Sequence, residues 1–440
     1  MKHNSNTRKR VKYFCWLLFL SLFLPDGFGY HVGNLFVIDR RLLLLLAALF
    51  LMRSQSVRAS DPRIVKYGLV LLLTMTASIF FSPIFLHSVL NLAQFFVFSL
   101  YIGYLTFRKF TLDDYHYLIE GLIYTFFFLS LIVISERIVG NTWYYNLFAA
   151  NVRMGQSGAN LFGEDVRLGL RAQGPFGHPI FASVDLAAIA SITLVKTIFS
   201  KERRRKYALF LFSNLAGIYS TSSRAGILAV IFVSLIIFFL TLRSPTARKN
   251  LRYGLVICAV VLALSPRIRH TLFVLTVGGI FPQYLSSYDY EATEAWNLQG
   301  RLTDARIAFE DIRQYGLFGV GQGVVSNQAR AREVLKSDVL LRLIGVYPYY
   351  LSILVENGLF GLLAFMAFLV YLFRKLWVLH FAKVGELQTL ALMALAFLLV
   401  YTIGWVSVNY AFESFLFFPL MTISKFSRQD AMVFQPNSHL

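Results

Sequence analysis

Hydrophobic residues occur in long blocks along this chain, and short polar or basic stretches separate them. Apolar blocks of about 20 residues are typical of helices that cross a lipid bilayer. Twelve such segments can be distinguished, and the pattern therefore predicts an all-α polytopic membrane protein with about 12 transmembrane helices. The segments are 13–24, 42–52, 67–86, 89–107, 117–134, 180–200, 207–221, 225–242, 253–264, 350–373, 387–408 and 411–423.

Two polar stretches are much longer than the others and divide the chain. Long loops in a compact protein usually carry function. We therefore expect the chemistry in these loops and at the helix ends beside them. The predicted parts are N-terminal transmembrane helices over 1–135, a first external loop over 136–178, central transmembrane helices over 179–265, a larger and partly helical external loop over 266–342, C-terminal transmembrane helices over 343–424 and a cytoplasmic tail over 425–440.

The first two apolar segments need separate interpretation. A basic N-terminus before an apolar run is shared by signal peptides and first transmembrane helices, but Pro25-Asp26-Gly27 offers no small-x-small cleavage site. We therefore expect an uncleaved first helix. The second segment is too short to span a membrane alone and begins beside Asp39-Arg40-Arg41. Either the preceding residues complete its helix, or the first two segments form a shallow pair.

Basic residues are distributed unequally between alternate loops. The stretches on the side of the N-terminus hold 25 Lys and Arg, whereas the two long loops hold 4 and 9 although they are longer in total. Because Lys and Arg accumulate on the cytoplasmic side, both termini are expected in the cytoplasm. The same rule explains the net charge of +19, so this charge does not indicate a nucleic-acid partner.

Composition agrees with a membrane protein. Hydrophobic residues make up 57% of the chain and charged residues 15%, whereas a soluble domain averages about 45 to 50% and about 25%. Cys15 and Cys258 both lie inside apolar runs. We therefore expect both to pack in the membrane core rather than to form a disulfide or a metal site.

Arginine is strongly preferred in the two long loops. Of their 13 basic residues, 12 are Arg and one is Lys336, whereas the inner stretches mix 11 Lys with 14 Arg. A guanidinium group can bind phosphate through two parallel hydrogen bonds and stays charged at any ordinary pH. The preference indicates an anionic substrate, phosphate or pyrophosphate, at the outer face. The alternative is that external Lys is avoided for topology and that these arginines pair with the acids of the second loop.

Three arginines stand in distinctive local sequences. Arg171 belongs to an Arg-x-x-Gly-Pro-Phe-x-His-Pro sequence directly before a predicted helix. Arg224 follows Ser222-Ser223 in a short polar interruption of an apolar stretch, which predicts a tight external turn between two helices. An arginine at membrane depth requires a polar cavity or an anion. Arg301 opens the polar part of the second loop, and Gly-x-Gly-x-Gly follows it at 319–323.

These glycines resemble the start of a dinucleotide fingerprint, but they lack its strand-then-helix context and lie on the outer side, where NAD is absent. The chain also contains no Walker sequence. ATP is therefore not the expected energy source. Chemistry at the outer face would instead need a substrate that is activated beforehand, such as a lipid-linked sugar pyrophosphate.

Taken together, these motifs and the Glu356-Asn-Gly358 sequence resemble the O-antigen ligase and polymerase family of bacterial inner membranes, over about 167–362. The resemblance implies transfer of a glycan from undecaprenyl pyrophosphate to an acceptor hydroxyl in the periplasm, with no metal, nucleotide or other cofactor. It implies that Arg224 and Arg301 bind the pyrophosphate and that Arg171 is a substrate-binding loop arginine. The implied partners are the lipid-linked oligosaccharide and membrane lipid, with a chain-length regulator as a further candidate.

The sequence departs from the family pattern at one position. Ligases of the family typically carry His-Asn about nine residues before the Glu of Glu-x-Gly, and this chain has Tyr347-Pro348 there. A Tyr hydroxyl, with a reference pKa near 10, is a poor general base at neutral pH. The departure favours a repeat-unit polymerase over a ligase that acts on lipid A core, and it leaves Tyr347 as a substrate-binding candidate.

The general base must then be sought among other residues. Glu356 is the first candidate, with Glu164, Asp165 and His178 behind it. Glu356 could equally be a helix-end carboxylate paired with an Arg. His178 precedes Pro179 and could cap the next helix or contact substrate.

A transporter of lipid-linked sugars is the competing function. Twelve helices suit both functions, but transporters tend to show internal repeats and charged sites near the membrane midplane. The charged residues inside the predicted helices, such as Asp185, Lys196 and Glu413, are few and scattered. The polar residues gather outside the membrane instead, and this favours the transferase.

Overall fold

The structure is a computed structural model. The predicted helix at 253–264, Arg301 and Tyr347 lie outside the residues that it describes. The described residues are 5–25, 29–32, 35–56, 61–148, 164–165, 169–200, 202–241, 316–321, 323–324, 349–381, 385–407 and 414–426.

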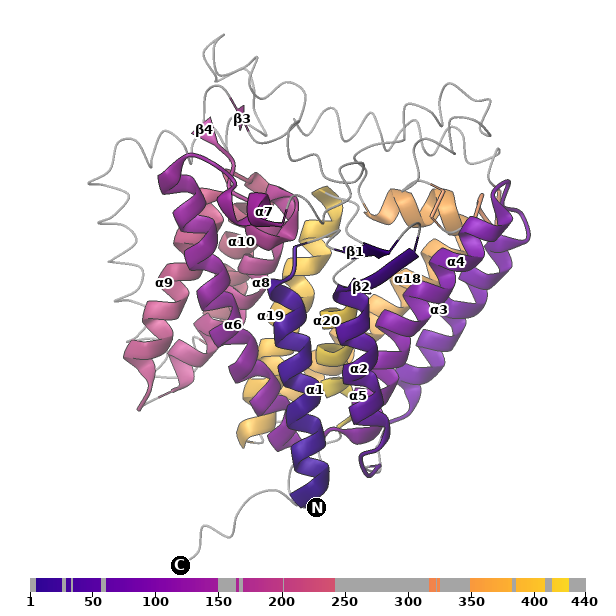
Figure 1. Ribbon diagram of the computed structural model, residues 1–440. Coiled ribbons are helices and arrows are strands. Elements are labelled where there is room, and N and C mark those ends of the chain that lie inside the picture. The colour runs from indigo at the N-terminus through magenta and orange to yellow at the C-terminus, as the bar shows by residue number, and fades with distance from the viewer. Residues whose placement is uncertain are drawn as a thin grey trace, which may run out of the picture.

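The described chain is mainly helical (Figure 1), so the helical prediction is confirmed. Two short antiparallel hairpins, β1 (Gly29–Val32) with β2 (Leu35–Asp39) and β3 (Glu164–Asp165) with β4 (Gly169–Leu170), are additions that the hydrophobic pattern does not predict. The helices are α1 (Ser5–Phe23), α2 (Arg40–Met52), α3 (Arg63–Ile79), α4 (Phe85–Phe95), the π-helix η1 (Phe96–Tyr101), α5 (Ile102–Lys109), α6 (Leu112–Val139), α7 (Trp143–Leu147), η4 (Gly174–Phe176), α8 (Pro179–Phe199), α9 (Arg204–Ser220), α10 (Arg224–Thr241), α18 (Tyr349–Phe381), α19 (Gly385–Ser407), α20 (Ser414–Met421) and η8 (Thr422–Lys425).

Five helical stretches in the described chain are long and apolar enough to cross a membrane, as expected of a multi-pass membrane protein. Shorter apolar helices accompany them, and every predicted apolar segment within the described residues overlaps a helix. The count of 12 transmembrane helices stays a prediction. The five stretches are Phe85–Lys109, Leu112–Val139, Pro179–Phe199, Tyr349–Phe381 and Glu386–Trp405.

The predicted boundaries of α2 and α3 differ from the structure. The third apolar segment was predicted to continue to residue 86, but α3 ends at Ile79 and α4 begins at Phe85. Pro83 accounts for the interruption, because proline lacks the backbone N–H that a helix interior needs and restricts the residue before it. At the start of α2, the residues before Arg40 form strand β2 rather than completing the helix, and α1 packs beside α2.

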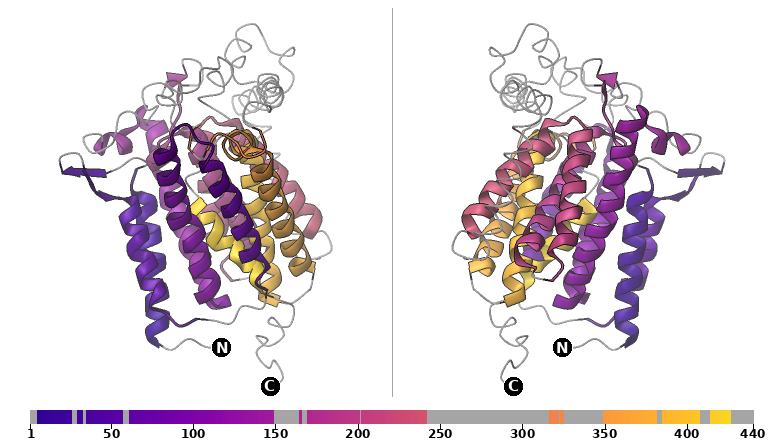
Figure 2. Two further views of the ribbon diagram at one scale, coloured as in Figure 1. Left: turned by 90° about the vertical axis from the view of Figure 1, so that its right-hand side faces the viewer. Right: turned by 90° about the vertical axis from the view of Figure 1, so that its left-hand side faces the viewer.

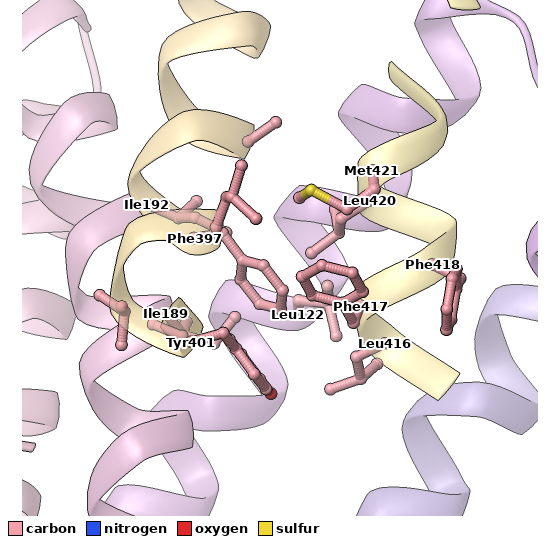
Figure 3. Packing of buried hydrophobic residues seen from close by; sticks show 14 of the residues in the cluster. Leu122, Ile189, Ile192, Phe397, Tyr401, Leu416, Phe417, Phe418, Leu420 and Met421 are labelled. Atoms are coloured by element: carbon pink, nitrogen blue, oxygen red, sulfur yellow. The ribbon is translucent and has the colours of Figure 1, made fainter. Parts of the chain in front are cut away.

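Helix α8 lies at the centre of the bundle. It packs against α6, α9, α10 and α19, and α19 in turn packs against α18 (Figures 1 and 2). Figure 3 shows the core where α19 meets α20, with Phe397 and Tyr401 close to Phe417 and with Leu122 and Ile189 beside them. The Phe397 and Tyr401 rings are 4.6 Å apart between centroids. Because α19 touches both α8 and α18, it fixes the relative position of the two helices that begin beside the sequence motifs.

Basic side chains join several chain segments at the end of the bundle where α1 begins. Arg10 donates to the carbonyl of Arg53, and Lys109 donates to the carbonyl of Ser54. Lys425 is fully buried, and its Nζ donates to the carbonyls of Phe107 and Phe110 at 2.7 and 2.6 Å. These lysines and arginines bind backbone carbonyls that end helices. The side of the membrane that this end faces stays a prediction.

A buried carboxylate belongs to the same end. Asp61 Oδ2 lies 2.7 Å from Lys375 Nζ, and Asp61 Oδ1 lies 3.0 Å from Arg63 Nε. Burial acts to raise the pKa of Asp61, but hydrogen bonds from Lys375 and Arg63 outweigh it and hold the pKa below its usual value. The start of α3 is therefore tied to α18 through an ionised carboxylate.

Candidate functional site

Helix α18 is interrupted at Gly358, whose backbone has φ of 67° and ψ of −170°. An interrupted helix leaves carbonyl and N–H groups without their helical partners, and these must be paired elsewhere when they are buried. The segment 316–321 supplies the partners. The bonds run from Val320 N to the Val355 carbonyl at 3.0 Å, from Gly321 N to the Glu356 carbonyl at 2.9 Å, and from Phe360 N to the Leu317 carbonyl at 3.1 Å.

Glycine is required on both sides of this contact. A Cβ atom added to Gly319, where φ is 80°, would lie 2.4 Å from the carbonyl carbon and oxygen of Glu356. A Cβ added to Gly358 would lie 2.3 Å from the carbonyl oxygen of Leu317. The Gly-x-Gly-x-Gly and Glu-x-Gly motifs, which the sequence shows about 35 residues apart, are therefore the two sides of one backbone contact.

Polar side chains from α3 and the α3–α4 corner surround this contact. Asn357 Oδ1 accepts a hydrogen bond from Ser78 Oγ at 3.2 Å, and Ser82 Oγ and Ser88 Oγ lie 2.7 Å apart. A Cβ on Gly321 would meet the Ser82 Cβ at 2.3 Å. Glu356 is 6% exposed, so it is held at a buried polar junction of the α18 break, the glycine turn and the α3–α4 corner.

The second part of the site is the turn between α9 and α10, and the structure has the tight turn that the sequence predicts. Ser222 has a φ of 51°, in the left-handed region that non-glycine residues rarely adopt. The N–H of Ser223 donates to Thr221 Oγ1 at 3.2 Å, and Arg224 is the first residue of α10. The turn thus fixes the backbone from which Arg224 extends.

The turn is also joined to the start of α8. Ser183 Oγ donates to Ser223 Oγ at 2.8 Å. A Cβ added to Gly226 would lie 2.5 Å from the carbonyl oxygen of Ser183, so α10 and α8 touch through backbone at this point. The Ser-Ser-Arg-Ala-Gly sequence therefore combines a hydrogen-bonded turn with a close helix contact.

The segment that carries Arg171 runs alongside this turn. The N–H of Ala172 donates to the carbonyl of Ser220 at 3.3 Å, which ties the segment to the end of α9. The chain then forms η4 and enters α8, where His178 Nδ1 accepts a hydrogen bond from the N–H of Ile180 at 3.1 Å. Arg171 and Arg224 thus lie on neighbouring stretches of one hydrogen-bonded backbone.

His178 caps helix α8. Burial, together with the positive charge of Arg171, lowers the pKa of His178 to about 4. Its imidazole is therefore neutral at pH 7. Because Nδ1 accepts from Ile180, the neutral ring carries its proton on Nε2 and has no second acceptor nitrogen. The capping interpretation of His178 fits this geometry, and its contact with substrate stays a prediction.

Helix α19 connects the two parts of the site. A Cβ on Gly404 would lie 2.8 Å from Val184 Cγ1 on α8, and the ring of Trp405 lies 5.2 Å from that of Tyr349, the first residue of α18. Figures 1 and 2 show the starts of α8, α10 and α18 at the same end of the bundle, opposite the start of α1. The motifs from distant parts of the sequence therefore meet at one end of the molecule.

The predicted site residues divide into four groups. Glu356 and its glycines form one polar junction, and Arg171, His178 and Arg224 belong to the second part of the site. The distance between the two parts is set by α19. Glu164 and Asp165, the other base candidates, form β3. Arg301 and Tyr347 lie outside the described residues, so their assigned roles stay predictions.

Sequence reasoning missed one residue of this region, Glu136. It was assigned to the start of the first external loop, but α6 continues to Val139 and includes it. Its side chain is completely buried, and Oε2 accepts hydrogen bonds from the N–H groups of Gln173 and Gly174 at 3.0 and 2.8 Å. An acidic residue near the end of a long apolar helix was the available signal. Its partners are backbone N–H groups, which nearly every residue type has, so the sequence does not identify them.

The described residues contain no group of three or more His, Cys, Asp or Glu side chains that could hold a metal ion. The site offers arginines, a carboxylate and paired backbone groups instead. Such a set can bind an anion and accept a proton.

Comparison with known proteins agrees with these motifs. No curated protein matches the chain. Residues 207–366 match the family model described as O-Antigen ligase, and the match includes the Ser-Ser-Arg turn, the glycine turn and the Glu-x-Gly break. It begins after Arg171 and His178, which precede the matched residues. Residues 207–366 are therefore similar to the O-antigen ligase family, which confirms the resemblance that the motifs indicate.

Proposed function

We propose that this chain is a membrane glycosyltransferase that joins undecaprenyl-pyrophosphate-linked repeat units of an O-antigen or exopolysaccharide at the periplasmic face of the bacterial inner membrane. The observation that carries the proposal is the buried Glu356 at a helix break. The backbone of this break is hydrogen-bonded to the glycine turn, and both lie inside the region that matches the family model. The break holds a carboxylate at the same end of the bundle as Arg171 and the turn before Arg224.

The proposed reaction is a substitution at the anomeric carbon of the lipid-linked glycan. A hydroxyl oxygen of the acceptor sugar forms the new glycosidic bond as the bond from the anomeric carbon to the pyrophosphate oxygen breaks. The bonding electrons leave with undecaprenyl pyrophosphate, and the hydroxyl proton passes to a base. The bond between the anomeric carbon and the pyrophosphate oxygen already activates the donor, so the proposed reaction needs neither a nucleotide nor a metal ion.

Arginines stabilise the charge that develops on the leaving pyrophosphate. In this proposal Arg224 and Arg301 bind it directly and Arg171 assists from the neighbouring segment. Each charge-assisted hydrogen bond contributes roughly 1.5 to 3 kcal/mol. Two bidentate arginines could therefore supply several kcal/mol of stabilisation that grows as the leaving group becomes charged.

Glu356 is the proposed proton acceptor. It is buried, and its backbone is fixed by the glycine turn, so its position is defined before substrate binds. The capping role of His178 strengthens this assignment, because the histidine's acceptor nitrogen is already engaged with Ile180. Tyr347 stands where ligases of the family typically have His-Asn, and we assign it to substrate binding.

A ligase that transfers the glycan to lipid A core is the second candidate, and the description of the matching family model favours it. Tyr347-Pro348 in place of His-Asn favours the polymerase. The acceptor separates the two functions, because a polymerase accepts another lipid-linked repeat unit whereas a ligase accepts lipid A core.

The direct test incubates the purified protein in lipid nanodiscs with a lipid-linked repeat unit, with and without lipid A core. Polymerase activity predicts a ladder of longer lipid-linked products in both samples. Transfer that requires the core would support the ligase. In the same protein reconstituted into closed vesicles, movement of the donor across the membrane without lengthening would support a transporter. Arg224→Ala should abolish the ladder while the protein remains in the membrane. Arg108→Ala changes an exposed arginine at the end of α5 and serves as the control.

A further inference from the structure

Glu136 is a buried acid that the proposed reaction does not use. It lies in the last turn of α6, its side chain has no exposed surface, and its Oε2 accepts two consecutive backbone N–H groups. The donors are Gln173 at 3.0 Å and Gly174 at 2.8 Å. A carboxylate that receives two N–H donors forms charge-assisted bonds, which are shorter and stronger than bonds between neutral groups.

The segment that Glu136 holds fits closely against α6. Gly174 has a φ of 55°, and a Cβ there would lie 2.9 Å from Val133 Cγ2, so only glycine fits without displacement. Gln173 is 2% exposed. Burial of a carboxylate at such a site is costly unless it is hydrogen-bonded. An apolar residue could fill the same volume without that cost. The reason for a carboxylate at this position is therefore the pair of backbone N–H groups that it binds.

The same segment leads directly to the arginines of the site. Arg171 stands two residues before Gln173, and the intervening Ala172 donates its N–H to the carbonyl of Ser220. Ser220 is the last residue of α9 and begins the turn that ends at Arg224. Hydrogen bonds made by adjacent residues of the Arg171 segment thus join it to Glu136 on one side and to the end of α9, which leads into the Ser-Ser-Arg turn, on the other.

We infer that Glu136 is a positioning residue: it fixes the backbone that carries Arg171 against the turn that carries Arg224, so that both arginines address one pyrophosphate group. This inference rests on the proposed function for its consequence in catalysis. Its structural part is that Glu136 fixes the backbone at residues 173–174, and this rests on the two hydrogen bonds and on the close contact of Gly174 with Val133.

Two substitutions distinguish this role from simple packing. Glu136→Gln keeps a side-chain oxygen that can accept the two N–H groups, whereas Glu136→Ala removes the acceptor. Loss of one charge-assisted bond corresponds to about a tenfold change or more in the opening equilibrium. Glu202→Ala removes an exposed carboxylate near the start of α9 and serves as the matched control.

The first measurement is amide hydrogen exchange of the 171–176 peptide in the full-length protein in nanodiscs. We expect exchange at Gln173 and Gly174 to be at least about tenfold faster in Glu136→Ala. Glu136→Gln, which keeps an acceptor but loses the charge, should give a smaller increase, and Glu202→Ala should match the wild type. Unchanged exchange in Glu136→Ala would overturn the inference, whatever the activity of the protein. This measurement needs no substrate, so it remains decisive even if the proposed function fails.

The second measurement is the kinetics of glycan transfer from the lipid-linked donor. Glu136→Ala should lower kcat/KM for the donor by about tenfold or more, and Glu136→Gln should restore most of it. Faster exchange with unchanged kcat/KM would overturn the link between Glu136 and the arginines. A wild-type protein that transfers no glycan would refute the proposed function, and the exchange result would then still show whether Glu136 holds the segment.

Discussion

Replacement of Gly319 by alanine tests the contact between the glycine turn and the break in α18. The new Cβ would lie 2.4 Å from the carbonyl carbon and oxygen of Glu356 and 2.5 Å from the N atom of Gly358. All three are backbone atoms, which cannot turn aside as the end of a flexible side chain can. The turn must therefore move away from α18 by about 1 Å to reach ordinary van der Waals distance.

The cost can be worked out from the structure. A non-glycine residue at positive φ costs about 1 to 2 kcal/mol. Separation of the turn from α18 also weakens the bonds of Val320 and Gly321 to the carbonyls of Val355 and Glu356. Each contributes about 1 kcal/mol, and a buried group that is left unpaired costs about 1 to 3 kcal/mol. We therefore expect Gly319→Ala to destabilise this junction by about 3 to 5 kcal/mol.

Amide hydrogen exchange at 316–321 and the rate of glycan transfer are the assays, and two other glycines provide matched controls. Gly316 has a φ of 59° and nothing within 4 Å of an added Cβ, so Gly316→Ala should cost only the strain of positive φ, about 1 to 2 kcal/mol. Gly68 lies within α3 and also has open space, so Gly68→Ala should be neutral or slightly stabilising. If Gly319→Ala behaved like Gly316→Ala, the steric argument would be refuted.

Three further predictions concern other parts of the structure. Gly226→Ala places a Cβ 2.5 Å from the carbonyl oxygen of Ser183 and should separate α10 from α8. We expect the free energy of unfolding to fall by about 2 to 4 kcal/mol and glycan transfer to become slower. An unchanged melting temperature would contradict the close contact. Ser222→Val should destabilise by about 2 kcal/mol because a β-branched residue resists positive φ, whereas Ser222→Gly should be tolerated in the same thermal melt. The pKa of Asp61 is lowered in the folded protein, so its ion pair stabilises the fold above the carboxyl's ordinary pKa and this contribution is lost as pH falls through the lowered value. Asp61→Asn should therefore reduce the free energy of unfolding by about 1 kcal/mol at pH 7. It should also remove this residue's part of the fall in melting temperature below about pH 4. Thermal melts from pH 3 to 7 would check both expectations.

Features that depend on local sequence could be predicted. Apolar blocks define the helices because a chain in lipid must pair its backbone within each helix. The Ser-Ser-Arg turn was predicted because polar residues interrupt an apolar stretch, and the start of α8 at Pro179 follows from the preference of proline for the first turn of a helix. The end of α3 was missed although Pro83 marks it, because hydrophobicity alone continues across the proline.

Features that depend on distant contacts could not be predicted. Nothing in the sequence around Gly319 says that its turn binds the backbone at Gly358, because hydrogen bonds between backbone groups do not depend on side-chain identity. Glu136 was missed for the same reason. The arginine preference of the outer loops pointed to an anionic substrate, but the site residue Arg301 lies outside the described chain, so its part in the site remains a prediction.

The helix break explains how a membrane helix can present a carboxylate for chemistry. In a continuous helix, the carbonyls of Val355 and Glu356 would accept from residues one turn later, and the position of Glu356 would be set only by helix packing. Because of the break at Gly358, these carbonyls accept instead from the N–H groups of Val320 and Gly321, so the glycine turn itself fixes the backbone of Glu356. In the proposed reaction, the glycine turn therefore fixes the backbone of the proton acceptor Glu356.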